Sequence, residues 1–357
     1  MTSENENAVK TDEPLDEEER RKIKLRRIGT PYNAWETLAV LYRNAFGVNK
    51  RKNKHIVNWL PKTAVLNEDV QNELTLGVVG DIMDMLGKRF VPGDDVIDFF
   101  HDCDFLLGNF EATITDSKGQ DGVIYGIEQS HDIKIIPALK EVFRPEKFYL
   151  SVANNHAGDF GRDIFFKSVK MLQDEGFQMF GWKKKPFADA GDHLRFITGT
   201  QWSNQVCNYV ARLKHPEYHC TKEGFNLLYP HWGNEHIIWP RPDTVTRGKD
   251  YLSRFGAVMG HHSHCPEPIS AFRINEETDD KSDPSCKPVA FGLGDFCSGL
   301  TLKKYWYGII VRLEIGRNND NIWKVGKLHY EFTACRPFDK QKGTCRTNII
   351  REYPYQS

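Results

Sequence analysis

Five apolar runs between residues 74 and 264 constrain the fold most, because each of them ends in polar side chains. They read "LTLGVVGD", "FLLGNFEA", "FYLSVANNH", "FNLLYPHWGNE" and "FGAVMGHHSH". Helical patterns such as "DVIDFFHD", "DIFFKSVKMLQDEG" and "TVTRGKDYLSRFG" lie between them. Alternation of strands and helices predicts an α/β fold. In such folds the working residues lie beyond the carboxyl ends of the strands, where these polar residues stand.

Composition excludes several classes of protein. The 357 residues are 39% hydrophobic and 27% charged with a net charge of −1, so no strong overall field favours binding to nucleic acid. The eight cysteines form no CxxC pair, which argues against a zinc ribbon and favours free thiols in a reducing compartment. The sequence shows no signal peptide and no apolar run of about 18 residues, so we expect a cytoplasmic protein without a transmembrane segment.

The N-terminal part of the chain differs from the rest. Residues 1–19 hold eight acidic residues and one Lys, and we expect them to be disordered. Residues 20–54 hold eleven Lys or Arg and one Glu, which we interpret as solvated charge rather than as a contact for an anionic surface or polymer. A short helix is predicted from Asn33 to Gly47, with Glu36 completing a capping box. We expect this helix to dock on the main domain; its apolar face comprises Trp35, Leu38, Leu41, Tyr42, Ala45 and Phe46.

These changes divide the chain into a charged extension, residues 1–70, and one main domain, residues 71–357. Near the end, "YGIIVRLEIG" and "VGKLHYEFTA" alternate in polarity and predict an antiparallel pair of strands. The sequence does not indicate an oligomeric state.

The ends of the five runs together offer a set of metal ligands. The set comprises Asp81, Asn109, Glu111, Asn154, Asn155, His156, His231, Glu235, His261, His262 and His264. Carboxylate, amide and imidazole ligands suit Mn, Fe, Zn or Mg better than a metal that prefers thiolates. One or two such ions would activate a water molecule, and a neighbouring histidine would serve as general acid or base.

The motifs also resemble a known family. The series "GDIM", "NFE", "ANNHAGDFG", "HWGNE", "GHHSH" and "LGDF" is similar to that of the bacterial capsule-synthesis protein CapA family, over roughly residues 74–296. These are poly-γ-glutamate synthesis proteins with a calcineurin-like metallophosphoesterase fold. The resemblance implies a four-layer α/β/β/α sandwich with a metal centre at one edge.

The resemblance also implies roles for individual residues. It makes His156 the catalytic histidine and implies the metal ligands Asp81, Asn155, His231, His262 and His264. Met83 stands where the first motif of metallophosphoesterases has a histidine, and Asn109 where the second has an aspartate. We therefore expect Glu111 to bind or bridge the metal, with Asn109 beside it.

The remaining polar residues have alternative roles. Asp159 orients His156 or caps the following helix, and capping is the expected role. Glu235 bonds to a metal-bound histidine or only holds its loop, and Asp295 closes the site or makes a turn. Asn154 is expected near the metal without binding it. His261 is expected to point away from the cluster, into the fold or toward substrate.

Two functions fit this pattern. The first is a metal-dependent hydrolase acting on an anionic substrate, either a phosphoester or a γ-glutamyl polymer. The second is an accessory protein, without catalysis, that binds an anionic polymer or a synthase complex. We favour the enzyme, because a scaffold has little use for an acid–base histidine beside metal ligands. A nucleic-acid substrate is not expected. Capsule proteins of the family are often membrane-anchored, so a part in capsule synthesis stays open for this chain.

Overall fold

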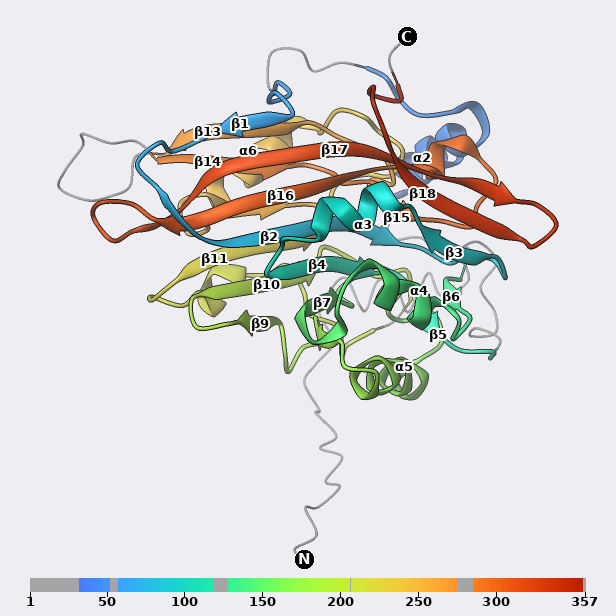
Figure 1. Cartoon of the computed structure of the whole chain (residues 1–357). Helices are drawn as coiled ribbons and strands as arrows, with labels where there is room; N and C mark the ends of the chain where they lie inside the picture. Colours follow the sequence, from blue (N-terminus) through green and yellow to red (C-terminus); the bar gives the residue numbers. More distant parts are fainter. Residues whose placement is uncertain (1–31, 52–56, 118–127, 206, 275–284, 356–357) are drawn as a thin grey trace, which may run out of the picture.

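Two mixed β-sheets form the centre of the molecule (Figure 1). The computed structural model describes residues 32–51, 57–117, 128–205, 207–274 and 285–355. The larger sheet has ten strands in the order β3-β18-β17-β16-β2-β4-β7-β8, with β1 paired to β17 and β15 to β2. The second sheet has six, in the order β13-β14-β12-β11-β10-β9. The α/β class predicted from the sequence is confirmed, with large mixed sheets.

The strands of the larger sheet are β1 (Thr63–Val65), β2 (Gln71–Ile82), β3 (Arg89–Pro92), β4 (Phe105–Phe110), β7 (Phe148–Ser151), β8 (Gln178–Phe180), β15 (Asp295–Cys297), β16 (Tyr307–Arg317), β17 (Trp323–Asp339) and β18 (Thr344–Ile350). Those of the second sheet are β9 (Phe187–Ala190), β10 (Leu194–Thr200), β11 (Phe225–His231), β12 (Ala257–Met259), β13 (Ile269–Ile274) and β14 (Ser285–Ala290). A separate small pair is β5 (Thr113–Ile114) with β6 (Ser130–His131). The helices are α2 (Ala34–Phe46), α3 (Asp94–Phe100), α4 (Ile135–Val142), α5 (Arg162–Asp174) and α6 (Pro242–Tyr251), with short 3₁₀ turns at Pro145–Lys147, Pro216–His219 and Lys303–Tyr305.

The five runs singled out in the sequence are strands β2, β4, β7, β11 and β12. In the larger sheet β2, β4 and β7 are parallel neighbours, and in the second sheet β11 is parallel to β12. Their near-continuous apolar character follows from burial on both faces. The predicted antiparallel pair is confirmed as β16 and β17.

The apolar core has three parts. Side chains of α3, α4 and α5 pack on one face of the larger sheet, the two sheets pack on each other, and α6 covers the outer face of the second sheet (Figure 1). Leu106 and Leu107 illustrate the alternation, since the first packs toward the helices and the second toward the other sheet. This arrangement leaves the ends of the strands as the place where polar side chains from both sheets can meet.

The N-terminal helix α2 begins and ends where the sequence predicted. The Asn33 side chain accepts a hydrogen bond from the backbone N–H of Glu36 at 2.9 Å, and Gly47 follows the last turn. The expectation that this helix docks on the main domain is confirmed, since Val40 and Arg43 are buried and Nε of Arg43 donates to the backbone carbonyl of Glu235 at 2.8 Å. Its apolar face is turned outward, with Trp35 and Phe46 83% and 75% exposed. The expected disorder of residues 1–19 concerns a segment outside the described residues.

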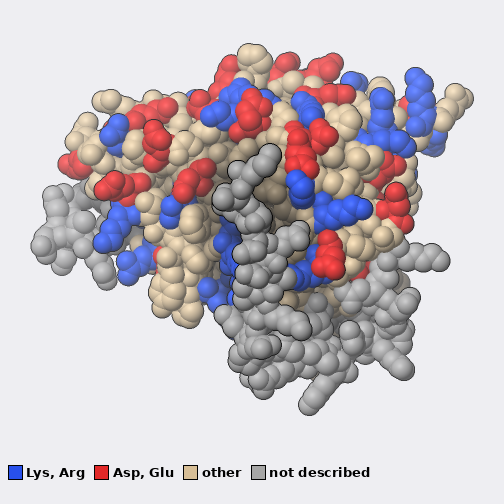
Figure 2. Space-filling model, turned by 90° about the horizontal axis from the view of Figure 1, so that it is seen from below, with Lys and Arg blue, Asp and Glu red and all other residues tan. Residues whose placement is uncertain are grey.

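The amino-acid composition also gave expectations about free cysteine thiols, membrane-spanning helices and the balance of surface charge. All eight cysteines are free. Among the described residues, no helix combines the length and the apolar character needed to cross a bilayer. Lys and Arg alternate with Asp and Glu over the described part of the face in Figure 2.

A close backbone approach fixes β2 against the segment before β15. The backbone N–H of Asp81 donates to the carbonyl of Gly294 at 2.9 Å. A Cβ atom at Gly80 would lie 2.0 Å from that same carbonyl oxygen. Only glycine therefore permits the contact that places Asp81 beside β15.

We predict that Gly80→Ala lowers the free energy of unfolding by at least about 2 kcal/mol, because the added carbon meets backbone that rotation of a side chain cannot relieve. Urea denaturation measures this. Gly326→Ala is the matched control, since its nearest contact is the Val70 side chain at 3.1 Å. An equal or smaller loss for Gly80→Ala than for the control would contradict the interpretation.

Candidate metal centre

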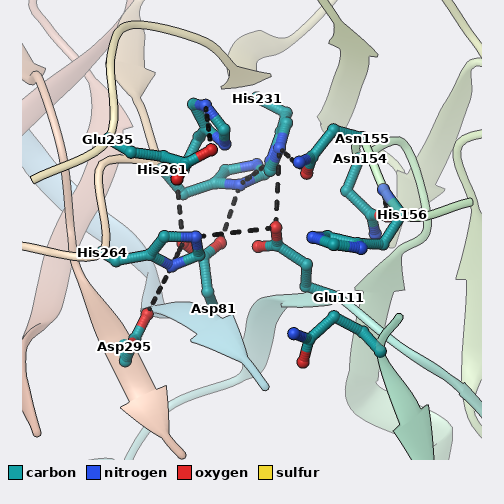
Figure 3. A network of polar contacts seen from close by, with 12 residues as sticks. Asp81, Glu111, Asn154, Asn155, His156, His231, Glu235, His261, His264 and Asp295 are labelled. Atoms are coloured by element: carbon teal, nitrogen blue, oxygen red, sulfur yellow. Dashed lines mark hydrogen bonds and ion pairs between the residues drawn. The ribbon is translucent and has the colours of Figure 1, made fainter. Parts of the chain in front are cut away.

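The predicted site residues gather where the carboxyl ends of strands from both sheets meet (Figure 3). In the larger sheet, Asp81 on β2 lies in register with Asn109 on β4 and with Asp295 on β15. In the second sheet, His231 at the end of β11 forms a bridge with His261, two residues beyond β12. The two sheets thus contribute carboxylates from one side and imidazoles from the other.

Asp81 connects the two sheets. Its Oδ1 lies 3.0 Å from Nδ1 of His261, and its Oδ2 accepts the backbone N–H of His262 at 3.0 Å. Burial would raise the pKa of this carboxyl, but the hydrogen bond from His261 and the nearby histidine charges outweigh burial and lower it. Asp81 is therefore an ionised carboxylate inside the protein.

Asn109 separates two carboxylates. Its Nδ2 donates to Oδ1 of Asp81 at 2.7 Å and to Oε2 of Glu111 at 3.1 Å, and its Oδ1 accepts from Asn154. An amide fits this position because it donates to both acids, where an aspartate would repel them. Burial, and then the charge of Asp81, raise the pKa of Glu111 well above its usual value.

His231 and Asn155 meet across the sheets. Nε2 of His231 lies 2.8 Å from Oδ1 of Asn155 and 3.7 Å from Oε1 of Glu111. Burial and the neighbouring charges of His262 and His261 lower the pKa of His231 well below its usual value. A neutral imidazole needs to lose no proton before it binds a metal.

The expectation that His261 points away from the cluster is wrong. Its Nδ1 lies 3.0 Å from both Asp81 and Nδ1 of His231, and its ring lies 4.3 Å from that of Tyr229 between centroids. The backbone bridge between residues 231 and 261 turns the ring inward, a contact that spacing along the chain does not reveal. The site therefore contains all three histidines of "GHHSH".

Tyr32 was not identified by sequence reasoning. Its hydroxyl donates to Oε1 of Glu235 at 3.2 Å and lies 2.8 Å from Nε2 of His262. Since the hydroxyl proton goes to Glu235, the tyrosine oxygen accepts from Nε2–H of His262, which leaves Nδ1 of that ring unprotonated. No motif marks Tyr32, because it precedes α2 and lies about 230 residues from its partner.

Glu235 does not bond to a site histidine directly, since its Oε1 lies 4.0 Å from Nε2 of His262, and it reaches that ring through Tyr32. It holds a tyrosine that orients His262, and its backbone carbonyl accepts from Nε of Arg43 at 2.8 Å, which ties its loop to α2. His262 itself has a φ of 99°. Such a conformation is strained for a residue with a Cβ, and it concentrates at functional sites.

Asp295 contacts His264 rather than making only a turn. Oδ1 of Asp295 lies 2.8 Å from Nδ1 of His264. Burial lowers the pKa of His264, but the charge of Asp295 outweighs burial and raises it to about 9. Burial also raises the pKa of Asp295, to about 7, despite the charge of His264. The two side chains thus form a close buried pair beside Asp81, 3.6 Å from Nδ1 of His264.

His156 lies next to this cluster with a carboxylate behind it. Its Nδ1 lies 2.6 Å from Oδ2 of Asp159, and its Nε2 lies 3.4 Å from Nδ2 of Asn204. The expected capping role of Asp159 is wrong: Gly161 is the cap residue of α5, and no side chain bonds to the free N–H groups there. Asp159 instead fixes the ring of His156, as the acid of a catalytic triad fixes its histidine.

Four buried polar atoms of the cluster have no hydrogen-bond partner among the described residues. They are Oε1 of Glu111, Nε2 of His261, Nδ1 of His262 and Oδ2 of Asp295. The two ring nitrogens offer lone pairs to a cation when the other nitrogen of each ring carries the proton, and the two carboxylate oxygens offer theirs when the acids are ionised. Buried polar atoms without partners are rare in proteins and require an explanation. A divalent cation would satisfy lone pairs of this kind, so the residues fit a metal.

Three overlapping groups of residues could each hold a metal ion, because the ligand atoms within each group lie within 4.8 Å of one another. They are Asp81–His231–His261, Glu111–His231–His262 and Asp81–His264–Asp295. Because Asp81 and His231 each belong to two groups, the arrangement has room for one ion or for a pair.

The sequence was also compared with known proteins. Residues 75–216 match the family described as bacterial capsule synthesis protein PGA_cap. The chain contains a PGA_cap domain. The match includes Asp81, Glu111, Asn155 and His156, whereas His231 and the "GHHSH" histidines lie beyond it. The predicted family is confirmed over these residues. Curated proteins give no match.

Seven solved chains resemble the fold. One is a hypothetical protein from Thermus thermophilus, with 14% identity, a TM-score of 0.37 and coverage of 78% of this chain and 99% of the other. Another is a candidate 5'-nucleotidase from Staphylococcus aureus in complex with alpha-ketoglutarate, with 12% identity and a TM-score of 0.41. That alignment covers 72% of this chain and about half, 53%, of the other.

We predict that Mn²⁺ or Zn²⁺ raises the stability of the protein and that His231→Ala abolishes the effect. Linkage gives about 2.7 kcal/mol at a metal concentration of about 100 Kd. Thermal unfolding with and without metal measures the shift, and plasma mass spectrometry gives the metal content. His101→Ala, which changes a mostly exposed histidine, is the control. Failure of the wild-type protein to take up or respond to any divalent ion would contradict the assignment.

We further predict that Tyr32→Phe weakens metal binding by roughly tenfold to a hundredfold, because the ring of His262 loses the partner that fixes its tautomer. Competition with a chelator measures the dissociation constant. Tyr42→Phe removes a hydroxyl from an exposed residue of α2 and should change nothing. Equal affinities for Tyr32→Phe and the wild type would show that the contact is only structural.

Proposed function

We propose that the chain is a metal-dependent hydrolase that cleaves phosphoesters. The observation that carries the proposal is a set of four buried polar atoms without hydrogen-bond partners among the described residues, carried by the cluster beside the His156–Asp159 pair. The residues that would hold one or two divalent ions are Asp81, Glu111, Asn155, His231, His262 and His264, with His261 and Asp295 also in reach. Mn, Fe, Zn and Mg all suit these oxygen and nitrogen ligands.

A bound ion would supply Lewis-acid polarisation of the substrate and lower the pKa of a water molecule. The chain's own residues do the rest. Asp159 holds Nδ1 of His156, so the ring presents Nε2 as the atom that gives a proton to the leaving oxygen.

The layering of the fold supports phosphoester chemistry. The order of helices, sheet, sheet and helix in the three core clusters supports the four-layer arrangement that the resemblance to calcineurin-like metallophosphoesterases implies. Fold alone does not identify the reaction, so the geometry of His156 carries more weight.

The PGA_cap domain brings γ-glutamyl polymers into consideration as a second anionic substrate. The eight free thiols fit a cytoplasmic protein.

The test uses p-nitrophenyl phosphate and bis-p-nitrophenyl phosphate with added Mn²⁺. We predict hydrolysis by the wild type and a fall in kcat of roughly a hundredfold or more for His156→Gln, with metal content unchanged. The Asp159→Asn variant should lower kcat and alter the pH profile, because the orientation of the His156 ring and its proton depend on that carboxylate.

The matched control is His101→Gln, because His101 and Asp102 form an exposed pair of the same type, 2.9 Å apart. This variant should keep full activity. A metal-loaded wild-type protein that hydrolyses neither ester would overturn the phosphoesterase proposal. Cleavage of γ-glutamyl oligomers by that protein would then identify an amidase, and binding without cleavage would identify an accessory protein.

A further inference from the structure

Helix α2 turns its polar face to the protein and its apolar face to solvent, the reverse of a helix packed on an apolar core. Its residues turned to the protein include Arg43 and Val40, each 4% exposed. Its apolar residues point to solvent: Trp35 is 83% exposed, Leu38 57%, Leu41 37%, Tyr42 64% and Phe46 75%. A surface helix of a globular protein normally buries its apolar stripe. Here the stripe forms a continuous outer surface of α2, which lies at the periphery of the molecule (Figure 1).

Polar contacts hold the helix in this orientation. Nη2 of Arg43 donates to Glu36 at 2.7 Å, and Glu36 also accepts from Arg241 at 2.5 Å. At the last turn, Nζ of Lys304 donates to the backbone carbonyls of Arg43 and Asn44 at 3.2 and 2.9 Å. Rolling the helix to bury its aromatic residues would break these contacts. The outward orientation is therefore a built feature.

The outward surface carries no charge within α2, since Glu36 and Arg43 are the charged residues of the helix and both face the protein. Positive charge flanks it instead. Lys50 and Arg51 are exposed just beyond the helix. The sequence from residue 20 to residue 54 holds eleven Lys or Arg and a single Glu.

We propose that α2 docks on an anionic lipid surface. Aromatic and leucine side chains on one face of a helix, flanked by basic residues, are the composition that inserts at the boundary between headgroups and acyl chains. Tyrosine and tryptophan prefer this depth because one end of each ring is polar. The basic residues meet the negative potential of lipids such as phosphatidylserine or phosphatidylglycerol.

Charge also decides between a lipid surface and a second copy of the chain as the occupant. Two copies that met through this face would leave Lys50 and Arg51 without acidic partners on α2, because the outward face of the helix carries no charge. An anionic surface complements both the apolar face and the basic flanks.

Docking through α2 would bring the candidate metal centre to the membrane. Tyr32 directly precedes the N-cap of α2, and its hydroxyl lies 2.8 Å from His262. The proposal rests on the helix and not on the hydrolase chemistry, so either can fail without the other.

Vesicle flotation of the full chain tests the proposal. One set of vesicles is phosphatidylcholine alone, and the other contains equal parts of phosphatidylcholine and phosphatidylglycerol. We expect the wild type to float with the anionic vesicles and to be released by salt. Trp35→Ser with Phe46→Ser should lower the partition coefficient at least roughly tenfold, because two large apolar side chains no longer insert. Lys50→Glu with Arg51→Glu should weaken binding to the anionic vesicles.

The matched control is Tyr218→Ser with Phe338→Ser, which removes two exposed aromatic residues outside α2, 79% and 61% exposed. This variant should bind as the wild type does. All substituted side chains are exposed, and circular dichroism verifies that each variant is folded. Loss of flotation in the control, equal binding to neutral vesicles, or no flotation of the wild type would each overturn the proposal. So would a dimer in sedimentation velocity that dissociates on Trp35→Ser with Phe46→Ser, since a second copy would then cover the face.

Discussion

The buried carboxylate of Asp81 is the point on which both the fold and the candidate site depend. It belongs to the larger sheet, yet it accepts from the backbone of His262 and faces His261, both carried by the second sheet. An ionised group inside a protein is tolerated only when neighbours compensate it, and removing one partner is costly. The two sheets are therefore joined at this edge by electrostatics as well as by the apolar layer between them. The glycine contact before β15 acts within the larger sheet, where it brings Asp295 into register with Asp81.

The sequence predicted the elements that depend on local pattern. Apolar runs that end in polar residues identified the five strands, and the ligand types at their ends identified most of the cluster. What the sequence could not reveal depends on long-range contacts. The inward turn of His261 follows from its bridge with residue 231, and the approach of Tyr32 follows from the docking of α2. Periodicity showed that α2 is amphipathic, and its docking on the main domain was expected, but the sequence did not reveal that its polar side faces the protein. Polar contacts of Glu36 and Arg43 decide the orientation instead.

The buried side chains of the cluster are electrostatically unfavourable on their own. A single kind of partner, a bound cation, would relieve the repulsion among them. Burial and the charge of Asp81 oppose ionisation of Glu111, whose pKa is raised. Burial and mutual repulsion keep His231 and His262 neutral, with their pKa values lowered. The φ of 99° at His262 adds about 1–3 kcal/mol of strain. A divalent cation would offset the repulsion between the carboxylates and would use the lone pairs that neutral imidazoles offer. The surrounding apolar core supplies the stability that lets such a site persist.

Asn109 shows how the departures from the metallophosphoesterase pattern fit together. An aspartate at this position would add a third carboxylate between Asp81 and Glu111, where the amide now donates to both. With the amide in place, Oε2 of Glu111 is engaged and Oε1 remains open toward His231 and His264, at 3.7 and 4.0 Å. Under the proposed role of Glu111 as a metal ligand, the acidic ligand stands two residues further along the chain than in the metallophosphoesterase pattern. Asn109 and Glu111 then act together, because the amide supplies the hydrogen bonds and the glutamate supplies the acidic group.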